Sequence, residues 1–246
     1  NYLAHAYLGD RDAEFMLGSL IGDFVKGTPG PPYSPGVIDG IFFHRRIDTY
    51  ADHHRATLAS RNLFSEPLRR YAGIILDICY DHFLSKNWDR YSSEDLSGFI
   101  HRTYRLLLNH RSILPPRLVS ILPRMLDQDW LACYRSLKGV DLTLKRMSKR
   151  LRNPDGFNGA ADEISRHYPL LEKNFFDFFP DLVQYAGVYP THELIYVKTR
   201  ITPEKIREIA AGRFVNRCVL SRRSASSEAE SLGEDRRLWG GGLFPK

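Results

Sequence analysis

Two carboxylates and an imidazole lie within the most apolar segment of this chain. Asp77, Asp81 and His82 are interspersed with apolar residues that recur at helical spacing. In a helix, Asp77 and Asp81 would lie one turn apart, about 40° around the axis, whereas His82 would be rotated roughly 100° from Asp81. Carboxylates are rarely buried unless they are paired, hydrogen-bonded or bound to a metal. The segment therefore predicts an ion held by Asp77 and Asp81, with His82 better placed to transfer protons.

A second cluster combines His44 with Asp48, four residues later. In a helix this spacing places an imidazole and a carboxylate on one face, which by itself is typical of an exposed pair. Together with the first cluster, it favours a metal site instead. Asp23, at the end of an apolar stretch, is a further candidate ligand, although such a residue can also simply end a helix. His5 is a fourth candidate, and a histidine in such a segment is more often part of the core.

Imidazole and carboxylate groups are suitable ligands for Mn, Mg, Fe or Zn ions. Such an ion polarises a phosphoryl oxygen and lowers the pKa of water, which suits the hydrolysis of a phosphoester. Arg45, next to the proposed ligand His44, could clamp the phosphoryl group with its fork of donors. His82 or Asp48 could handle protons. Asp52, one turn beyond Asp48, could orient a ligand.

The elements that would carry these residues are helices. Apolar residues follow helical spacing after residue 11, without a convincing run of alternating strand residues, which predicts an all-α fold. Ser34 followed by Pro35 indicates a helix start, and Ser92 with Asp95 resembles a capping box. The expected helices cover residues 11–26, 35–48, 66–88, a segment after residue 92, and residues 116–134, 141–152 and 160–179.

Composition limits the remaining classes of protein. The chain of 246 residues is 43% hydrophobic and can form one sizeable core. It lacks a membrane-spanning apolar run and a basic, apolar leader, so we expect a cytoplasmic protein that does not bind membranes. Three widely spaced cysteines do not indicate a disulfide framework. Residues 187–246 contribute four of the six net positive charges, and the weakly basic remainder argues against a nucleic-acid partner.

We expect two parts in the chain. Residues 1–185 form a single helical domain that contains all of the candidate site residues. Residues 186–246 have little periodic apolar content and contain serine and glycine runs. They are expected to be an appendage that is partly disordered or was introduced by cloning.

The combination of motifs resembles the acyl carrier protein phosphodiesterase family. The resemblance covers residues 1 to about 185, and the combination is specific although each motif alone is weak. It rests on Asn1-Tyr2-Leu3-Ala4-His5, Gly22-Asp23-Phe24-Val25-Lys26-Gly27, Gly40-Ile41, His44-Arg45-Arg46-Ile47-Asp48, Asp52, Asp77 and Asp81-His82-Phe83-Leu84. The resemblance also implies that only an initiator methionine precedes Asn1.

The resemblance implies an activity and a site. Members of the family hydrolyse the phosphodiester that joins 4′-phosphopantetheine to a serine of holo acyl carrier protein, which leaves the apo carrier. They use a divalent metal, usually Mn, and Mg or Fe is also compatible with these ligands. The family is viewed as a divergent branch of the helical HD-type metal phosphohydrolases. The residues that carry over are the metal ligands His5, Asp23, His44, Asp77 and Asp81 and the catalytic residues Arg45, Asp48 and His82.

Two other functions stay open at this level. The same ligands would serve an HD-type phosphohydrolase that acts on nucleotides. Alternatively, a non-catalytic helical adaptor could bind acidic proteins or nucleic acid through basic groups such as Lys145-Arg146 and Lys149-Arg150. The sequence does not determine the number of ions or the oligomeric state.

Overall fold

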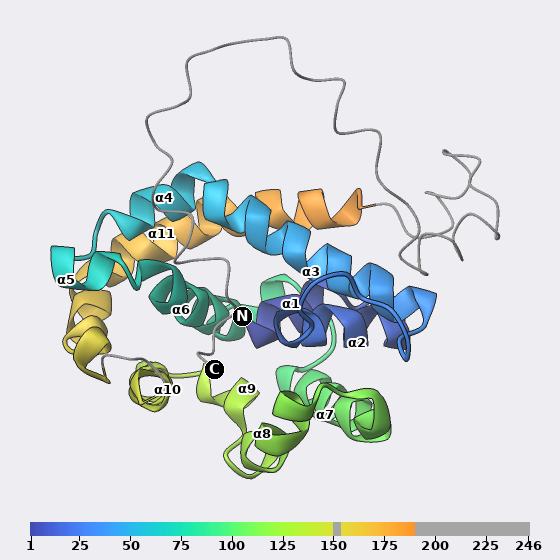
Figure 1. The fold of residues 1–246 in the computed structure, drawn as a ribbon. Helices are drawn as coiled ribbons and strands as arrows, with labels where there is room; N and C mark the ends of the chain where they lie inside the picture. Colours follow the sequence, from blue (N-terminus) through green and yellow to red (C-terminus); the bar gives the residue numbers. More distant parts are fainter. Residues whose placement is uncertain (150–153, 190–246) are drawn as a thin grey trace, which may run out of the picture. The chain divides into compact units, whose positions relative to one another are not determined.

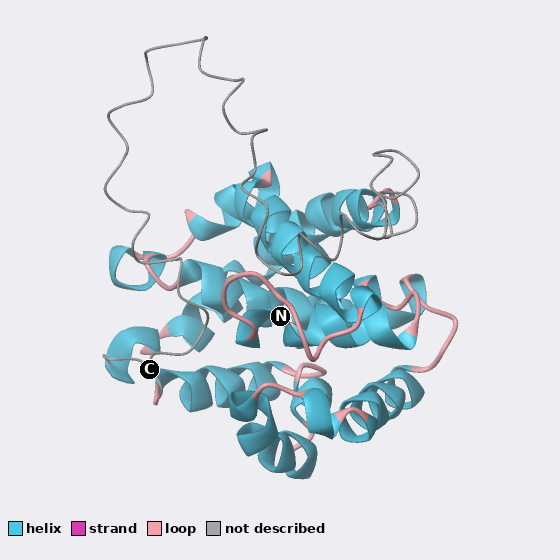
Figure 2. Ribbon diagram, turned by 45° about the vertical axis from the view of Figure 1, so that its right-hand side comes forward, coloured by secondary structure: helices cyan, strands magenta, loops and turns pink. Residues whose placement is uncertain are grey.

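Helices joined by short connections make up the computed structural model, which describes residues 1–149 and 154–189 (Figures 1 and 2). Within these residues there are eleven α-helices and no strand, so the predicted all-α class is confirmed. The helices are α1 (Tyr2–Leu8), α2 (Ala13–Ile21), α3 (Pro35–His53), α4 (Arg55–Arg61), α5 (Glu66–Arg69), α6 (Ala72–Lys86), α7 (Leu96–Asn109), α8 (Pro116–Asp127), α9 (Trp130–Cys133), α10 (Leu137–Ser148) and α11 (Ala160–Gly187).

The described residues belong to one compact unit. The predicted boundary at residue 185 falls in the last turns of α11, and the division into domain and appendage stays a prediction because residues 190–246 lie outside the described residues. None of the described helices combines the length and the apolarity needed to cross a membrane.

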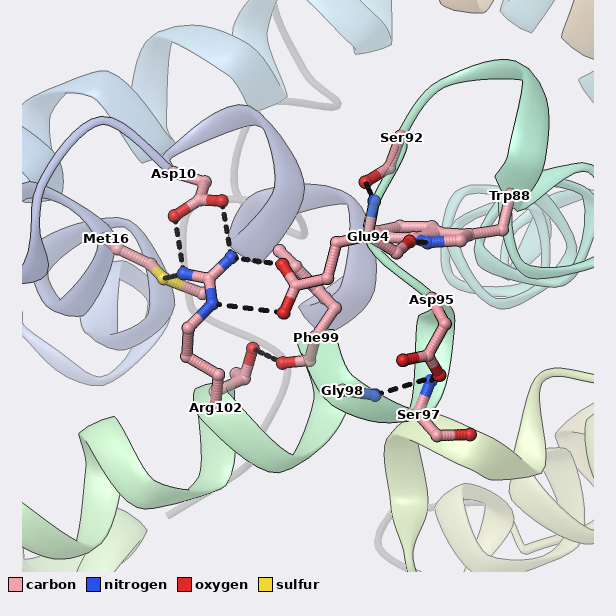
Figure 3. Close-up of polar contacts among 11 residues, drawn as sticks. Asp10, Met16, Trp88, Ser92, Glu94, Asp95, Ser97, Gly98, Phe99 and Arg102 are labelled. Carbon is pink, nitrogen blue, oxygen red and sulfur yellow. Dashed lines mark hydrogen bonds and ion pairs between the residues drawn. The ribbon is translucent and has the colours of Figure 1, made fainter.

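Helix starts were predicted with mixed success. Ser34 caps α3 as expected, since its hydroxyl accepts the N–H of Val37 at 3.4 Å. Ser92 was the wrong cap for α7: Asp95 accepts the N–H groups at the start of that helix, while the Ser92 hydroxyl accepts the N–H of Glu94 (Figure 3). A carboxylate immediately before the helix reaches these donors, whereas Ser92 precedes a separate turn.

Several predicted helices have other bounds in the structure. The expected helix over 116–134 is divided into α8 and α9, the one over 141–152 is α10, and those over 35–48 and 160–179 continue to His53 and Gly187. The expected helix over 66–88 is divided into α5 and α6, because the chain turns at Tyr71, whose ring packs against Phe157 at 5.4 Å between centroids. The expected helix over 11–26 ends at Ile21 and continues as a 3₁₀ turn, Gly22–Phe24. This turn carries Asp23.

Helix α6 is enclosed by other helices and forms much of the core. It contacts α1, α4, α10 and α11, and Ile75, Ile78, Cys79 and Phe83 are at most 1% exposed. A helix that is apolar on most of its surface must be covered on most of its surface. The apolar segment that contains Asp81 is therefore buried, as the sequence predicts.

Arg102 of α7 holds the turn between α1 and α2. Its guanidinium forms two bonds to the carboxylate of Asp10, of 2.8 and 2.7 Å, and a further bond of 2.8 Å to Glu94 (Figure 3). Fork-shaped pairing of this kind fixes geometry well. Because the group is partly exposed, we expect its contribution to stability to be only about 1 kcal/mol.

Helices α2 and α3 touch through their backbones. A Cβ atom on Gly18 would lie 2.1 Å from the carbonyl oxygen of Val37, and one on Gly40 would lie 2.2 Å from that of Phe15. Only glycine allows such an approach at both positions. This close crossing of α2 and α3 determines which residues of the two helices lie opposite each other after Gly18 and Gly40.

We predict that Gly18→Ala lowers the free energy of unfolding by at least about 2 kcal/mol, because the added methyl group meets backbone and not a mobile side chain. Urea unfolding followed by circular dichroism measures this change. Gly187→Ala is the matched control, since a Cβ there meets no described atom within 4 Å, and its stability should be unchanged or slightly raised. Equal stability of Gly18→Ala and the wild type would contradict the close crossing.

Candidate metal centre

Four predicted site residues come together where α1, the end of α2 and α3 meet. Asp48 bridges two imidazoles: its Oδ1 lies 3.0 Å from Nε2 of His5, and its Oδ2 lies 3.2 Å from Nε2 of His44. Oδ1 of Asp23 lies 3.3 Å from the same nitrogen of His44. The His44–Asp48 pair predicted from helical spacing is therefore present, and it is joined by His5 and Asp23.

The ring of His44 is oriented by the neighbouring helix. Its Nδ1–H donates to the carbonyl oxygen of Ser19 at 2.7 Å, which leaves Nε2 pointing at the two carboxylates. Gly22 provides the space, because a Cβ there would lie 2.3 Å from Cγ of His44. Metal-binding histidines typically donate one ring N–H to a backbone carbonyl or a carboxylate, which leaves the other nitrogen for the ion.

His5 lies directly against this ring. The two imidazoles stack with 3.8 Å between centroids and 22° between planes. The carbonyl oxygen of His5 accepts the Ser19 hydroxyl at 2.8 Å, so one residue of α2 contacts both histidines. Sequence reasoning missed Ser19, whose carbonyl contact carries no signal in the sequence.

The charges of the four groups depend on one another. Burial and the neighbouring charge of His44 lower the pKa of His5 to about 4. Burial also opposes protonation of His44, but the carboxylates of Asp48 and Asp23 outweigh it and raise the pKa of His44 to about 10. The pKa of Asp48 lies well below its usual range, because the two imidazoles outweigh the effect of burial. The arrangement thus attracts one positive charge.

The donor set fits a divalent cation. One ligand atom from each of His5, His44 and Asp48 lies within 4.8 Å of the others. Nδ1 of His5 is buried without a hydrogen-bond partner among the described residues, which is costly for a polar atom unless something binds it. Two imidazoles with one or two carboxylates suit Mn, Fe or Zn. These residues could therefore hold a metal ion.

One side of the cluster is open. The side chains of His5 and His44 are 6% and 5% exposed, whereas those of Asp48 and Asp23 are 48% and 26% exposed. The imidazoles thus form the inner wall and the carboxylates reach the surface. A substrate would approach from the carboxylate side.

The residues of α6 are not part of this cluster. Asp77 is exposed, yet the surrounding protein displaces enough water to raise its pKa to about 7, and the charges of Asp48, Asp52 and Asp23 contribute. Asp77 therefore lies near the centre without contacting it. As the sequence predicts, Asp81 is buried, but both of its oxygens accept backbone N–H groups of α1.

His82 faces another part of the fold. Its Nδ1 lies 2.7 Å from the carbonyl oxygen of Tyr134, and its Nε2 lies 2.9 Å from the hydroxyl of Tyr168. Both nitrogens are thus engaged away from the cluster. Its predicted part in proton transfer stays a prediction, and these contacts favour a role in packing.

Two further residues of α3 have partners beside the cluster. A terminal nitrogen of Arg45 donates to the carbonyl oxygen of Val25 at 2.7 Å, two residues after Asp23. Asp52, expected to orient a ligand, instead pairs with Arg61 at 2.5 Å. Arg45 thus lies against the segment that carries Asp23.

The sequence of this chain matches a known protein family over most of the described residues. The sequence profile of the acyl carrier protein phosphodiesterase family matches residues 1–182. This chain belongs to that family. Proteins described as acyl carrier protein phosphodiesterases are 35% identical in Serratia proteamaculans, 35% in Photorhabdus laumondii and 34% in Yersinia enterocolitica. Each alignment covers 76% of this chain and 97%, 94% and 97% of the relative, respectively.

The matches confirm the resemblance seen in the sequence. No solved structure is significantly similar to the chain. The relation of the acyl carrier protein phosphodiesterase family to HD-type phosphohydrolases is not tested by these matches and stays a prediction.

We predict that Gly22→Ala disrupts the candidate metal centre. The added methyl group would occupy the space of the His44 ring, so Mn²⁺ should bind at least about tenfold more weakly. Titration followed by electron paramagnetic resonance measures the affinity. Gly30→Ala, in the same connection and with no described atom within 4 Å of its added Cβ, should bind Mn²⁺ like the wild type. Unchanged affinity in Gly22→Ala would exclude His44 as a ligand.

Proposed function

We propose that this chain hydrolyses the phosphodiester between 4′-phosphopantetheine and a serine of holo acyl carrier protein, which yields the apo carrier. The observation that carries the proposal is the cluster of His5, His44 and Asp48, which lies entirely within the residues that match the family profile. The names of the relatives support the same activity.

His5, His44 and Asp48, together with Asp23, would hold the divalent cation that the reaction uses. Mn is the ion we expect, and Mg or Fe would also suit these donors. When bound, the cation supplies positive charge to a phosphoryl oxygen and acidifies water. Asp77 remains a further candidate ligand, since it lies close enough for its pKa to respond to Asp23 and Asp48.

The protein's own groups bind and orient the substrate. Asp48 fixes both imidazoles at once and reaches the surface, so it also faces the incoming phosphodiester. Arg45 uses one terminal nitrogen to bind Val25, and a guanidinium has five N–H donors. We assign its other donors to the phosphoryl oxygens, where fork geometry favours Arg over Lys.

Several predictions from composition accompany this function. We propose that the protein is cytoplasmic and that it binds neither nucleic acid nor membranes. The basic group at 145–152, of which residues 150–152 lie outside the described residues, is predicted to be a solvated face, with docking of an acidic carrier protein as the alternative. Within the described residues, Lys145 already pairs with Asp141, so its charge is partly neutralised.

We predict that His44→Ala abolishes the release of phosphopantetheine, with a fall in rate of at least about 100-fold. The substitution removes a proposed metal ligand and the imidazole that Asp48 contacts. Mass spectrometry of holo carrier incubated with enzyme and Mn²⁺ follows the loss of the arm. His53→Ala is the control: this histidine is exposed on the same helix and contacts Thr49 of its own helix. It should retain the wild-type rate.

The same assay, together with a nucleotide panel and the Mn²⁺ titration, separates the competing functions. Full activity of His44→Ala would contradict the proposed centre. A wild-type protein that leaves holo carrier intact but hydrolyses members of a nucleotide panel would be an HD-type nucleotide phosphohydrolase. A protein that neither binds Mn²⁺ nor acts on either substrate would fit the non-catalytic adaptor.

A further inference from the structure

The start of α1 lies beside α6 (Figure 1), and a side chain of α6, Asp81, binds it. Oδ2 of Asp81 accepts the N–H of Leu3 at 3.0 Å, and Oδ1 accepts the N–H of Ala4 at 2.9 Å. The carboxylate is completely buried. The first N–H groups of a helix have no acceptor inside the helix, and a negative charge there also interacts favourably with the helix dipole.

This contact replaces a cap that α1 lacks. Asn1 occupies the capping position, but its side chain makes no capping bond and donates to the hydroxyl of Tyr134 at 2.8 Å. Leu3 and Ala4 are the second and third residues of the helix. Their N–H groups are the ones that a capping side chain ordinarily binds. Asp81 therefore caps α1 from a position 78 residues away in the sequence.

His5 directly follows Leu3 and Ala4, whose N–H groups bind Asp81. On its other side, its carbonyl oxygen accepts the Ser19 hydroxyl, and its ring meets Asp48 at 3.0 Å. Helix α1 has only seven residues, and such a short helix keeps its conformation only through tertiary contacts. The position of His5 in the cluster thus depends on how the start of α1 is held.

We infer that Asp81 is a positioning residue of the metal centre, which acts through α1 on His5 and does not bind the ion. The inference rests on the proposed metal-dependent function. The described residues that can share an ion are His5, His44 and Asp48, without Asp81. If Asp81 turned toward an ion, the buried N–H of Leu3 and the partly buried N–H of Ala4 would lose their acceptor, which is unfavourable.

Hydrogen exchange of the wild-type protein tests this directly. If Asp81 only positions α1, adding Mn²⁺ should leave the amides of Leu3 and Ala4 as protected as before or slow their exchange. If Asp81 moves to the ion, the same amides should exchange faster when Mn²⁺ is added. Faster exchange would overturn the inference, and this measurement needs no variant that must fold.

Variants test how the effect reaches the centre. Asp81→Asn should weaken Mn²⁺ binding by about 10- to 100-fold, as removal of groups that support metal ligands typically does. In a His5→Ala background, the same substitution should cost less than about twofold, because its effect passes through His5. Asn1→Asp should restore most of the affinity to Asp81→Asn, since a carboxylate at the capping position can bind the same amides. If Asp81 were instead a ligand of the ion, a carboxylate at position 1 would not restore the affinity.

Ser85→Ala is the matched control. Ser85 is buried one turn further along α6, and its hydroxyl has no hydrogen-bond partner among the described residues. Its Mn²⁺ affinity should equal that of the wild type. The inference is wrong if Asp81→Asn binds Mn²⁺ as tightly as the wild type. It is also wrong if the losses of Mn²⁺ affinity in Asp81→Asn and His5→Ala multiply in the double variant, or if Asn1→Asp restores no affinity to Asp81→Asn. Wild-type inactivity toward holo carrier would refute the proposed substrate but would leave these exchange and binding results intact.

Discussion

The crossing of α2 over α3 at two glycines is the constraint on which the centre depends. With Gly18 and Gly40 in backbone contact, the carbonyl of Ser19 comes within 2.7 Å of His44. One turn further on, Gly22 leaves the space that the His44 ring fills. A side chain at any of these glycines would separate the helices or displace the ring, because the groups it would meet are backbone or a packed imidazole.

The electrostatics of the centre follow from this packing. Asp23 and Asp48 both face Nε2 of His44, so they require a positive charge between or beside them. Burial, together with the neighbouring charge of His44, lowers the pKa of His5 to about 4, whereas the carboxylates of Asp48 and Asp23 outweigh burial and raise the pKa of His44 to about 10. Metal ligands must be deprotonated to bind. A divalent cation would therefore take over the charge that the His44 proton otherwise provides.

The sequence predicts the parts of this centre that depend on local periodicity. The spacing of His44 and Asp48 follows from the helix that contains them, and the burial of Asp81 follows from its apolar neighbours. The partner of Asp81 could not be found in the same way, because it is the backbone of a helix 78 residues earlier. His5 stood out only through the family resemblance. Ser19 acts through its carbonyl and hydroxyl on two histidines, and no property of a single serine predicts that.

The division of the centre into a buried and an exposed half favours catalysis over a purely structural metal. A structural site encloses its ion with protein ligands, whereas a catalytic site keeps an open position. Here the imidazoles are almost completely buried, and Asp48 is nearly half exposed. A phosphodiester carried on the surface of another protein cannot enter a deep cavity together with its carrier. A shallow centre, with its carboxylates at the surface and Arg45 beside them, is accessible to such a substrate because the reacting group need only be presented to it.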